Sequence, residues 1–255
     1  MLVDERRMKI FEYLKERGSA TTEELAAKFS VSGATIRRDL AYLSKRNLIT
    51  RTHKGALIEK RSPETNFLIN YNFMKQEKEI IAQKALGLIE EGDFIALSGG
   101  STTYIFAKKL IGSRIRNLTI ITNAINIATL FIESIKGFRV ILAGGIPKRG
   151  FYECVGEMTH KIIKNFNIDK FFVGTNGISL EGGISFFDLE EAEVSRTMQK
   201  HSKKTYLMVD HTKFGLTQKV RALEFEDINL IITDKIPKEI GDIEREFKKK
   251  NIKII

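Results

Sequence analysis

The chain has 255 residues, of which 42% are hydrophobic and 29% are charged, so it can bury a sizeable core in one large domain or in two unequal ones. Its longest apolar runs have the length of a strand and are broken by polar residues, which excludes a membrane-spanning helix. The N-terminal residues lack the apolar block of a secretory signal and Cys154 is the single cysteine, so we expect a cytoplasmic protein without an internal disulfide.

The net charge of +10 is concentrated in one short region. Residues 1–36 hold as many acidic as basic side chains, whereas residues 37–61 hold eight basic and two acidic ones and carry a net charge of +6. A basic block of this size indicates a polyanion as the partner, because contacts to phosphates release condensed counterions. A basic face that is merely solvated is the alternative.

Residues 4–45 carry three helical patterns joined by short polar segments. Gly18 ends the first pattern, and Thr21 with Glu24 has the spacing of a capping box that opens the second. Ser32 can cap the third, and the apolar face of this third helix is formed by Ile36, Leu40 and Leu43. Two short helices joined by a tight turn predict a helix-turn-helix.

The start of the third helix offers side chains that can read DNA. An arginine there can bond one guanine through two hydrogen bonds, and a hydroxyl can reach a base edge or a phosphate. We also expect Asp39 to hold Arg38 in position. The predicted DNA-binding residues of this helix are Ser32, Thr35, Arg37 and Arg38. Helical spacing alone leaves an ordinary three-helix scaffold as the alternative.

Two short apolar or β-branched runs follow the third helix. Residues 48–52 and 56–58 flank His53, Lys54 and Gly55, which predicts a hairpin with a glycine in its turn. The hairpin makes the module a winged helix. The side chains expected to touch phosphates or the minor groove are Arg51, His53 and Lys54. For His53, a turn residue without a partner is the alternative.

Residues 31–58 resemble the DeoR-type regulators, which are bacterial repressors of sugar and nucleoside metabolism. The run TIRRDL at residues 35–40 matches the recognition helix of that family, and the wing matches as well. Lys54 and Asn47 depart from the family, which usually has a glycine at the first position and commonly at the second. The resemblance implies a winged helix-turn-helix that binds a double-stranded DNA operator.

The remaining sequence predicts a second, larger domain. We expect a winged helix-turn-helix over residues 1–58, a linker over residues 59–72 and a sensor domain over residues 73–255, which opens with a helix over residues 73–90. Strands and helices then alternate, which predicts an α/β fold with a mainly parallel sheet covered on both faces. The expected strands are residues 94–97, 118–122, 139–142, 170–173, 205–209 and 230–233. The expected helices are residues 103–110, 125–133, 156–165 and 190–201.

A loop with the sequence SGGSTT follows the first of these strands and opens a helix. Its glycines let a ligand approach the backbone, and its amides and hydroxyls offer donors at the positive end of the helix. The phosphate of a small metabolite is the expected ligand, although a simple structural turn explains the same loop equally well. The residues of this candidate site are Gly99, Gly100, Ser101, Thr102 and Thr103.

Other strand ends are expected to meet at the same edge of the sheet. These ends carry Thr122, Asn123, Gly144, Gly145, Asn176 and Gly177, and charge is supplied by Asp188, Glu191, Asp210 and Lys213. The segments also resemble the DeoR-type sensor domain, whose fold is related to ribose-5-phosphate isomerase. The resemblance implies that the loop holds the phosphate of a sugar, with Asn123, Gly145, Asn176 and Lys213 lining the site. At Ser98 the family commonly has an acidic residue.

These patterns predict a repressor of carbohydrate-metabolism genes whose operator binding is controlled by a phosphorylated sugar. Pseudopalindromic operators imply a homodimer or a higher homo-oligomer. The alternative is a sugar-phosphate isomerase with an accessory DNA-binding module, in which Asp188 or Glu191 would act as the base. The four histidines lack metal-ligand spacing, so we expect no metal, no cofactor and no membrane contact.

Overall fold

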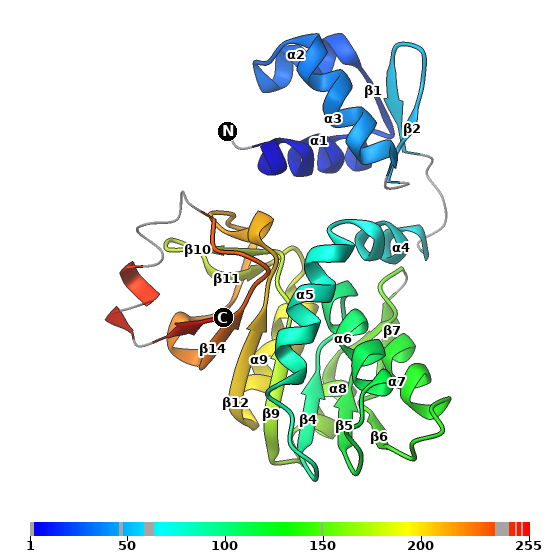
Figure 1. Cartoon of the computed structure of the whole chain (residues 1–255). Helices are drawn as coiled ribbons and strands as arrows, with labels where there is room; N and C mark the ends of the chain where they lie inside the picture. The colour runs from blue at the N-terminus through cyan, green and yellow to red at the C-terminus, as the bar shows by residue number, and fades with distance from the viewer. Residues whose placement is uncertain are drawn as a thin grey trace. The chain divides into compact units, whose positions relative to one another are not determined.

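The computed structural model describes residues 3–45, 48–58, 64–148, 150–237, 245–247, 249–250 and 252–255. It divides into two compact units, Met1–Phe73 and Met74–Ile255, shown in Figure 1. Among the described residues, none of the helices combines the length and the apolar character that a membrane crossing requires.

The first unit is a winged helix. Its elements are α1 (Val3–Arg17), β1 (Ser19–Thr21), α2 (Thr22–Phe29), α3 (Gly33–Lys45), β2 (Thr50–Arg51), β3 (Gly55–Leu57) and α4 (Glu64–Asn72). The three strands form one antiparallel sheet in the order β1-β3-β2, which confirms the predicted wing. The capping box of Thr21 and Glu24 is also present at the start of α2. The core is formed by the fully buried side chains of Phe11, Leu14, Leu25, Ile36, Leu40 and Leu43.

Two predictions about the segment after the wing are wrong in part. Within the stretch expected to be a linker, α4 is a helix of nine residues. The next helix, α5 (Lys75–Leu86), lies within residues 73–90, where a helix was expected, and is shorter than expected at both ends. Met74 precedes α5 in the left-handed region, with φ of 50°, and this conformation separates the two helices. The helical periodicity of α4 is weak because its sequence mixes polar and aromatic residues without a clear apolar face.

The second unit is built on a seven-stranded parallel sheet. Its strands are β4 (Phe94–Leu97), β5 (Thr119–Thr122), β6 (Arg139–Leu142), β9 (Ile168–Val173), β12 (Ser202–Met208), β14 (Leu230–Ile232) and β15 (Lys253–Ile254), in the order β15-β14-β12-β9-β4-β5-β6. Every neighbouring pair is parallel. The predicted mainly parallel sheet is therefore confirmed.

Helices cover both faces of this sheet, as Figure 1 shows. On one face lie α5, α6 (Ser101–Gly112) and α7 (Ile125–Ile132), and on the other lie α8 (Glu157–Ile163) and α9 (Leu189–Lys200). Phe106 of α6 packs on Phe172 of β9 with ring centroids 4.8 Å apart, and both side chains are fully buried. Burial of each such side chain stabilises the fold by about 1.5–3 kcal/mol.

The order of the strands creates a switch point between β4 and β9. From β4 the chain moves through β5 to the edge strand β6, and it then returns to β9 on the other side of β4. The loops after β4 and β9 therefore diverge at the carboxyl edge of the sheet. In open α/β sheets this is the position at which ligands bind.

Two small antiparallel sheets accompany the large one. The hairpin β7 (Ile146–Lys148) and β8 (Glu153–Val155) follows β6. A three-stranded sheet is formed by β10 (Gly177–Ser179), β11 (Gly183–Phe186) and β13 (Val220–Leu223). Neither was predicted, because strands of three or four residues next to glycines lack a readable alternation. The short 3-10 helices are η1 (His211–Lys213) and η2 (Phe225–Asp227).

Candidate DNA-binding and effector sites

Helix α3 presents two exposed cationic side chains near its start. Ser32 caps the helix, because its Oγ accepts a hydrogen bond from the Thr35 amide at 3.2 Å, and the two hydroxyls lie 3.0 Å apart. Ile36 is fully buried, and this orientation leaves Arg37 and Arg38 exposed on the outside. The helix therefore offers two guanidinium groups and two hydroxyls at the end that faces the groove in helix-turn-helix proteins.

Asp39 does not hold Arg38, contrary to the sequence prediction. Its carboxylate is buried, and it accepts hydrogen bonds from Arg6 Nε at 2.6 Å and Arg7 Nε at 3.0 Å. The guanidinium of Arg7 also stacks on the ring of Tyr42, 3.8 Å from its centroid. Asp39 thus fastens α3 to α1 and leaves Arg38 available, because one carboxylate bridges two arginines of the other helix.

The wing carries three exposed side chains, Arg51, His53 and Lys54. Its turn is closed by a hydrogen bond from the Thr52 amide to the Gly55 carbonyl at 2.9 Å. A Cβ atom at Gly55 would overlap the carbonyl oxygen of Ala20 on β1, so this close approach requires a glycine. The wing is therefore positioned against β1 by its backbone, and its tip carries exposed side chains that could contact phosphates.

In the second unit, the loop of residues 98–103, here called the phosphate loop, lies at the switch point. Ser98 Oγ accepts a hydrogen bond from the Gly174 amide at 3.3 Å, which joins the loops after β4 and β9. Gly100 caps α6 with φ of 106°, a conformation that favours glycine. The first turn of α6 contains no acidic side chain, so its free amides can receive an anion.

The hydroxyl groups of the phosphate loop differ in their roles. Thr103 is fully buried, and its Oγ1 donates to the carbonyls of Gly99 and Gly100, so it shapes the loop. Ser101 and Thr102 are half-buried, and their hydroxyls make no hydrogen bond within the part of the chain that the structure describes. These two hydroxyls are therefore the ones available to a ligand.

The segment after β5 adds a buried amide to this edge. Thr122 is fully buried and its Oγ1 accepts a hydrogen bond from the Ala124 amide at 3.0 Å, so it shapes the turn. The Nδ2 atom of Asn123 donates to the Cys154 carbonyl at 3.0 Å and to Glu153 Oε2 at 3.4 Å. The Oδ1 atom of Asn123 is buried and accepts no hydrogen bond from any described residue. A buried acceptor without a donor is costly, and a bound ligand can supply that donor.

Several of the other predicted ligand residues have structural roles here. A Cβ at Gly145 would overlap Thr159 Oγ1, and one at Gly177 would overlap the Leu216 carbonyl, so both positions require glycine for packing. The carbonyl of Gly144 accepts a hydrogen bond from Thr159 Oγ1 at 2.9 Å. The Oδ1 of Asn176 accepts one from the Phe187 amide at 3.1 Å. These contacts within the protein stabilise the loops in which the four residues lie.

A cluster of charged side chains connects α9 with the β7–β8 hairpin. Lys148 Nζ pairs with Glu191 at 3.0 Å and also with Asp188, which caps α9. Burial opposes the charge on Lys148, but the hydrogen bond to Asp188 and the charge of Glu191 outweigh it and raise the pKa of Lys148. Glu191 therefore belongs to an ion-pair network, and Lys148 is a residue that the sequence did not single out.

Lys78 of α5 is a second residue that the sequence missed. Its side chain is buried, and burial lowers its pKa to about 8, opposed by the charge of Asp210 and assisted by that of Lys213. Asp210 follows β12 at the carboxyl edge of the sheet, so the predicted residue Lys213 is accompanied there by a second amine. The sequence could have indicated that Lys78 is buried, because it has helical spacing with the buried Ile81, Ala82 and Ala85.

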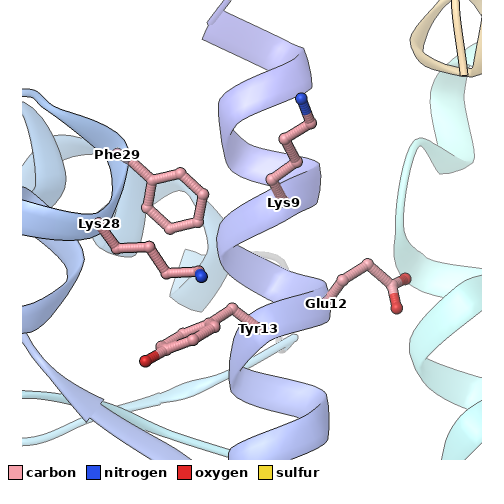
Figure 2. A pocket seen from close by; sticks show the side chains of 5 residues that line it. All are labelled: Lys9, Glu12, Tyr13, Lys28 and Phe29. Atoms are coloured by element: carbon pink, nitrogen blue, oxygen red, sulfur yellow. The ribbon is translucent and has the colours of Figure 1, made fainter.

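Figure 2 shows a hollow on the first unit, between α1 and α2. It is lined by Lys9, Glu12, Tyr13, Lys28 and Phe29. Lys28 Nζ lies 4.6 Å from the centroid of the Tyr13 ring, so the amine is already engaged by an aromatic face. The hollow lacks the converging amides and hydroxyls of the phosphate loop and includes none of the predicted ligand residues.

Among the described residues, no group of histidine, cysteine and acidic side chains has the geometry of a metal site.

The fold and these two sites define a class of protein, a winged-helix DNA-binding regulator with a separate α/β sensor domain. The DeoR-like helix-turn-helix domain matches residues 6–62, and the DeoR C terminal sensor domain matches residues 74–235. The chain belongs to the DeoR family of transcriptional regulators.

Relatives in this family are similar over nearly the whole chain. The glycerol-3-phosphate regulon repressor of Escherichia coli (strain K12) is 36% identical over 229 residues, which cover 89% of each protein. The HTH-type transcriptional repressor GlcR of Bacillus subtilis (strain 168) is 31% identical over 240 residues, 94% of this chain and 91% of the relative. Since these relatives are repressors, the isomerase alternative is wrong and the chain is a regulator, not an enzyme.

Solved structures similar to the chain include a ribose-5-phosphate isomerase in complex with phospho-erythronic acid, with a TM-score of 0.42 and 18% identity over 55% of this chain and 54% of the other. The translation initiation factor eIF-2B of Pyrococcus horikoshii OT3 has a TM-score of 0.49 and 15% identity over 92% of this chain and 98% of the other. Likenesses of this size carry no argument about ligands or activity.

Proposed function

We propose that this regulator represses genes of carbohydrate metabolism and that a phosphorylated sugar, bound at the carboxyl edge of the parallel sheet, controls its affinity for the operator. The observation that carries the proposal is the phosphate loop at the switch point, where free amides of α6 and the hydroxyls of Ser101 and Thr102 are available to an anion. The names of relatives support it, since they include repressors of a glycerol-3-phosphate regulon and of a lactose phosphotransferase system.

Within this proposal each predicted DNA-binding residue has a role. Arg37 and Arg38 read bases from α3, while Ser32 and Thr35 contact base edges or phosphates. Arg51, His53 and Lys54 contact the backbone or the minor groove from the wing. Two copies of the chain bind the two halves of a pseudopalindromic operator, and the protein acts in the cytoplasm, where this DNA lies.

Within the sensor, the phosphate is held by the phosphate loop and balanced by the amines of Lys78 and Lys213. Asn123 contacts the remainder of the ligand through its unpaired oxygen. Switching requires only that the ligand bind the operator-competent and operator-incompetent states with different affinities.

The double variant Ser101→Leu/Thr102→Leu is expected to abolish the response to sugar phosphates. Leucine removes both hydroxyls and fills the space in which an anion would approach the first turn of α6. Operator binding without ligand is expected to stay unchanged, because the DNA-binding residues lie in the other unit. Fluorescence anisotropy of a labelled operator, with and without added sugar phosphate, measures both quantities.

The matched control is Thr129→Leu, which removes an exposed hydroxyl on α7. It is expected to respond to ligand like the wild type. If the double variant still changes its operator affinity when the sugar phosphate is added, the ligand site lies elsewhere. The effector itself is found by thermal unfolding with ribose 5-phosphate, glucose 6-phosphate and glycerol 3-phosphate, since a ligand at 100 times its Kd stabilises the native state by about 2.7 kcal/mol.

A further inference from the structure

Glu153 is a buried acid that lies directly against the phosphate loop. Its residue is 8% exposed, and a Cβ atom at Gly99 would overlap its carboxyl group, so Gly99 leaves the space that the side chain occupies. Among the described residues, its side chain has one hydrogen-bond partner, Asn123, whose Nδ2 lies 3.4 Å from Oε2. The ion pairs of Lys148 with Asp188 and Glu191 lie nearby and do not include it.

The fold fixes Glu153 in this position by backbone hydrogen bonds. The Cys154 amide donates to the Asn123 carbonyl at 2.7 Å, and the Ile125 amide donates to the Tyr152 carbonyl at 2.7 Å. An antiparallel bridge between Ala124 and Glu153 connects the same segments. The β7–β8 hairpin therefore folds back onto the end of β5 and carries the carboxyl group to the phosphate loop.

The unpaired oxygen of Asn123 belongs to the same arrangement. Asn123 is 1% exposed, and its Oδ1 accepts no hydrogen bond from any described residue. Because Oδ1 and Nδ2 share one amide carbon and Nδ2 lies 3.4 Å from Glu153 Oε2, this oxygen and the Glu153 carboxyl group belong to the same small part of the site. The dianionic phosphate group of a sugar phosphate offers only acceptors and cannot satisfy it, whereas a hydroxyl group of the sugar can donate to one neighbour and accept from another.

The surroundings of Glu153 favour its neutral form. Burial and the charge of Glu191 raise its pKa to about 8, assisted by Asp188 and opposed by the Asn123 hydrogen bond and the charge of Lys148. A neutral carboxyl group can both donate and accept a hydrogen bond, and it does not repel a phosphate on the neighbouring loop. The acid is therefore compatible with an anionic ligand at neutral pH.

We propose that Glu153 is a specificity-determining residue of the effector site, where its carboxyl group and the Oδ1 atom of Asn123 bind a hydroxyl group that the ligand carries close to its phosphate. The inference rests on the proposed function. It predicts that the site binds phosphorylated polyols and sugars with higher affinity than inorganic phosphate. Glu153 positions the carbon chain, while the phosphate loop holds the charge.

The test compares two ligands and three variants of the full-length protein by calorimetric titration. The ligands are inorganic phosphate and whichever of ribose 5-phosphate, glucose 6-phosphate and glycerol 3-phosphate stabilises the wild type most. Glu153→Ala is expected to reduce the preference for the sugar phosphate over inorganic phosphate by about tenfold or more, because the hydroxyl loses a partner. The control Glu157→Ala, which changes an exposed acid at the start of α8, is expected to leave this preference unchanged.

The variant Glu153→Gln distinguishes the hydrogen-bonding role of the Glu153 side chain from the effect of its ionisation on ligand affinity. Its amide still donates and accepts, so it is expected to keep most of the preference. Wild-type affinity for the sugar phosphate is expected to fall about tenfold between pH 7 and pH 9, because an ionised Glu153 must take up a proton when the anion binds. The variant is expected to lose the part of this fall that Glu153 contributes and to keep only a smaller fall due to Lys78, whose pKa is about 8, since the second ionisation of the phosphate, near pH 6, is complete in this range.

Folding is checked by thermal unfolding of the free proteins. The pKa of Glu153 is raised from 4.5 to about 8, so the wild type loses stability as the pH rises through this window. Glu153→Gln lacks this loss and is expected to unfold at the same or a higher temperature at pH 8.

An unchanged ligand preference in Glu153→Ala, or a wild-type affinity that is flat between pH 7 and pH 9, overturns the inference and leaves the proposed function standing. If no phosphorylated compound stabilises the wild type or alters its operator binding, the proposed function fails and the inference fails with it.

Discussion

Replacing Asp39 by alanine is expected to lower the free energy of unfolding of the winged-helix unit by about 3 kcal/mol, since removing one partner of a buried ion pair costs about 3–5 kcal/mol and Arg7 is partly solvated. The carboxylate is 2% exposed and accepts hydrogen bonds from Arg6 and Arg7, so its loss leaves the buried Arg6 guanidinium without this acceptor, while Arg7 keeps its hydrogen bond to Asp4. Hydrogen exchange of α1 and α3 amides in increasing urea measures the change.

The control for this variant is Glu5→Ala, which removes an exposed pair with Lys9 four residues along the same helix. Pairs of that kind contribute about 0.3–0.5 kcal/mol. A loss below about 1 kcal/mol in Asp39→Ala would contradict the role assigned to the carboxylate, because the two variants would then differ by little more than a surface pair does.

The variants Arg37→Ala and Arg38→Ala are expected to weaken operator binding by about 1–3 kcal/mol each if the side chain reads a base. Discrimination should be lost at one base pair for each arginine. Lys54→Ala on the wing is expected to weaken binding to all sequences alike and to reduce the salt dependence by about one counterion, as the proposed contact of Lys54 with a phosphate requires. Anisotropy titrations against single-base variants of an operator fragment from the protein's own locus distinguish the two patterns.

Lys45→Ala is the matched control, since this exposed cation lies at the opposite end of α3. Its effect on base preference is expected to be negligible. Arg37→Ala and Arg38→Ala proteins that bind every fragment as the wild type does would show that α3 is not the recognition helix. A uniform loss over all fragments would assign both arginines to the phosphates.

Much of the fold was readable from the sequence. Strands β4 and β6 cover the predicted residues, because each appears in the sequence as a short apolar run between polar turns. β4 is a largely buried central strand, whereas β6 is a half-exposed edge strand. The helix-turn-helix was readable because Thr21, Glu24 and Ser32 mark helix starts by local hydrogen bonds. The β7–β8 hairpin was missed, since it depends on pairing with residues 123–125 and not on its own sequence pattern.

The sequence predicted some residues of the candidate sites and missed others, again depending on whether their contacts are local or distant along the chain. The phosphate loop is contiguous, so Gly99 and Ser101 could be proposed from the sequence alone. Glu153 reaches that loop only through a long-range bridge, and Asp39 finds Arg6 only because α1 packs on α3. Short-range spacing reports caps and turns, whereas the partner of a buried charge is set by tertiary packing.

The switch point affects the order in which the two units of the protein fold. The loop that receives the effector depends on β4 being flanked by β9, and Ala96 pairs with Phe171 far along the chain. The winged helix, by contrast, is closed by contacts within its own short stretch of sequence. Local contacts form faster than distant ones, and the amino end leaves the ribosome first. In a newly synthesised copy, the winged-helix unit would therefore fold before the parallel sheet that forms the proposed effector site.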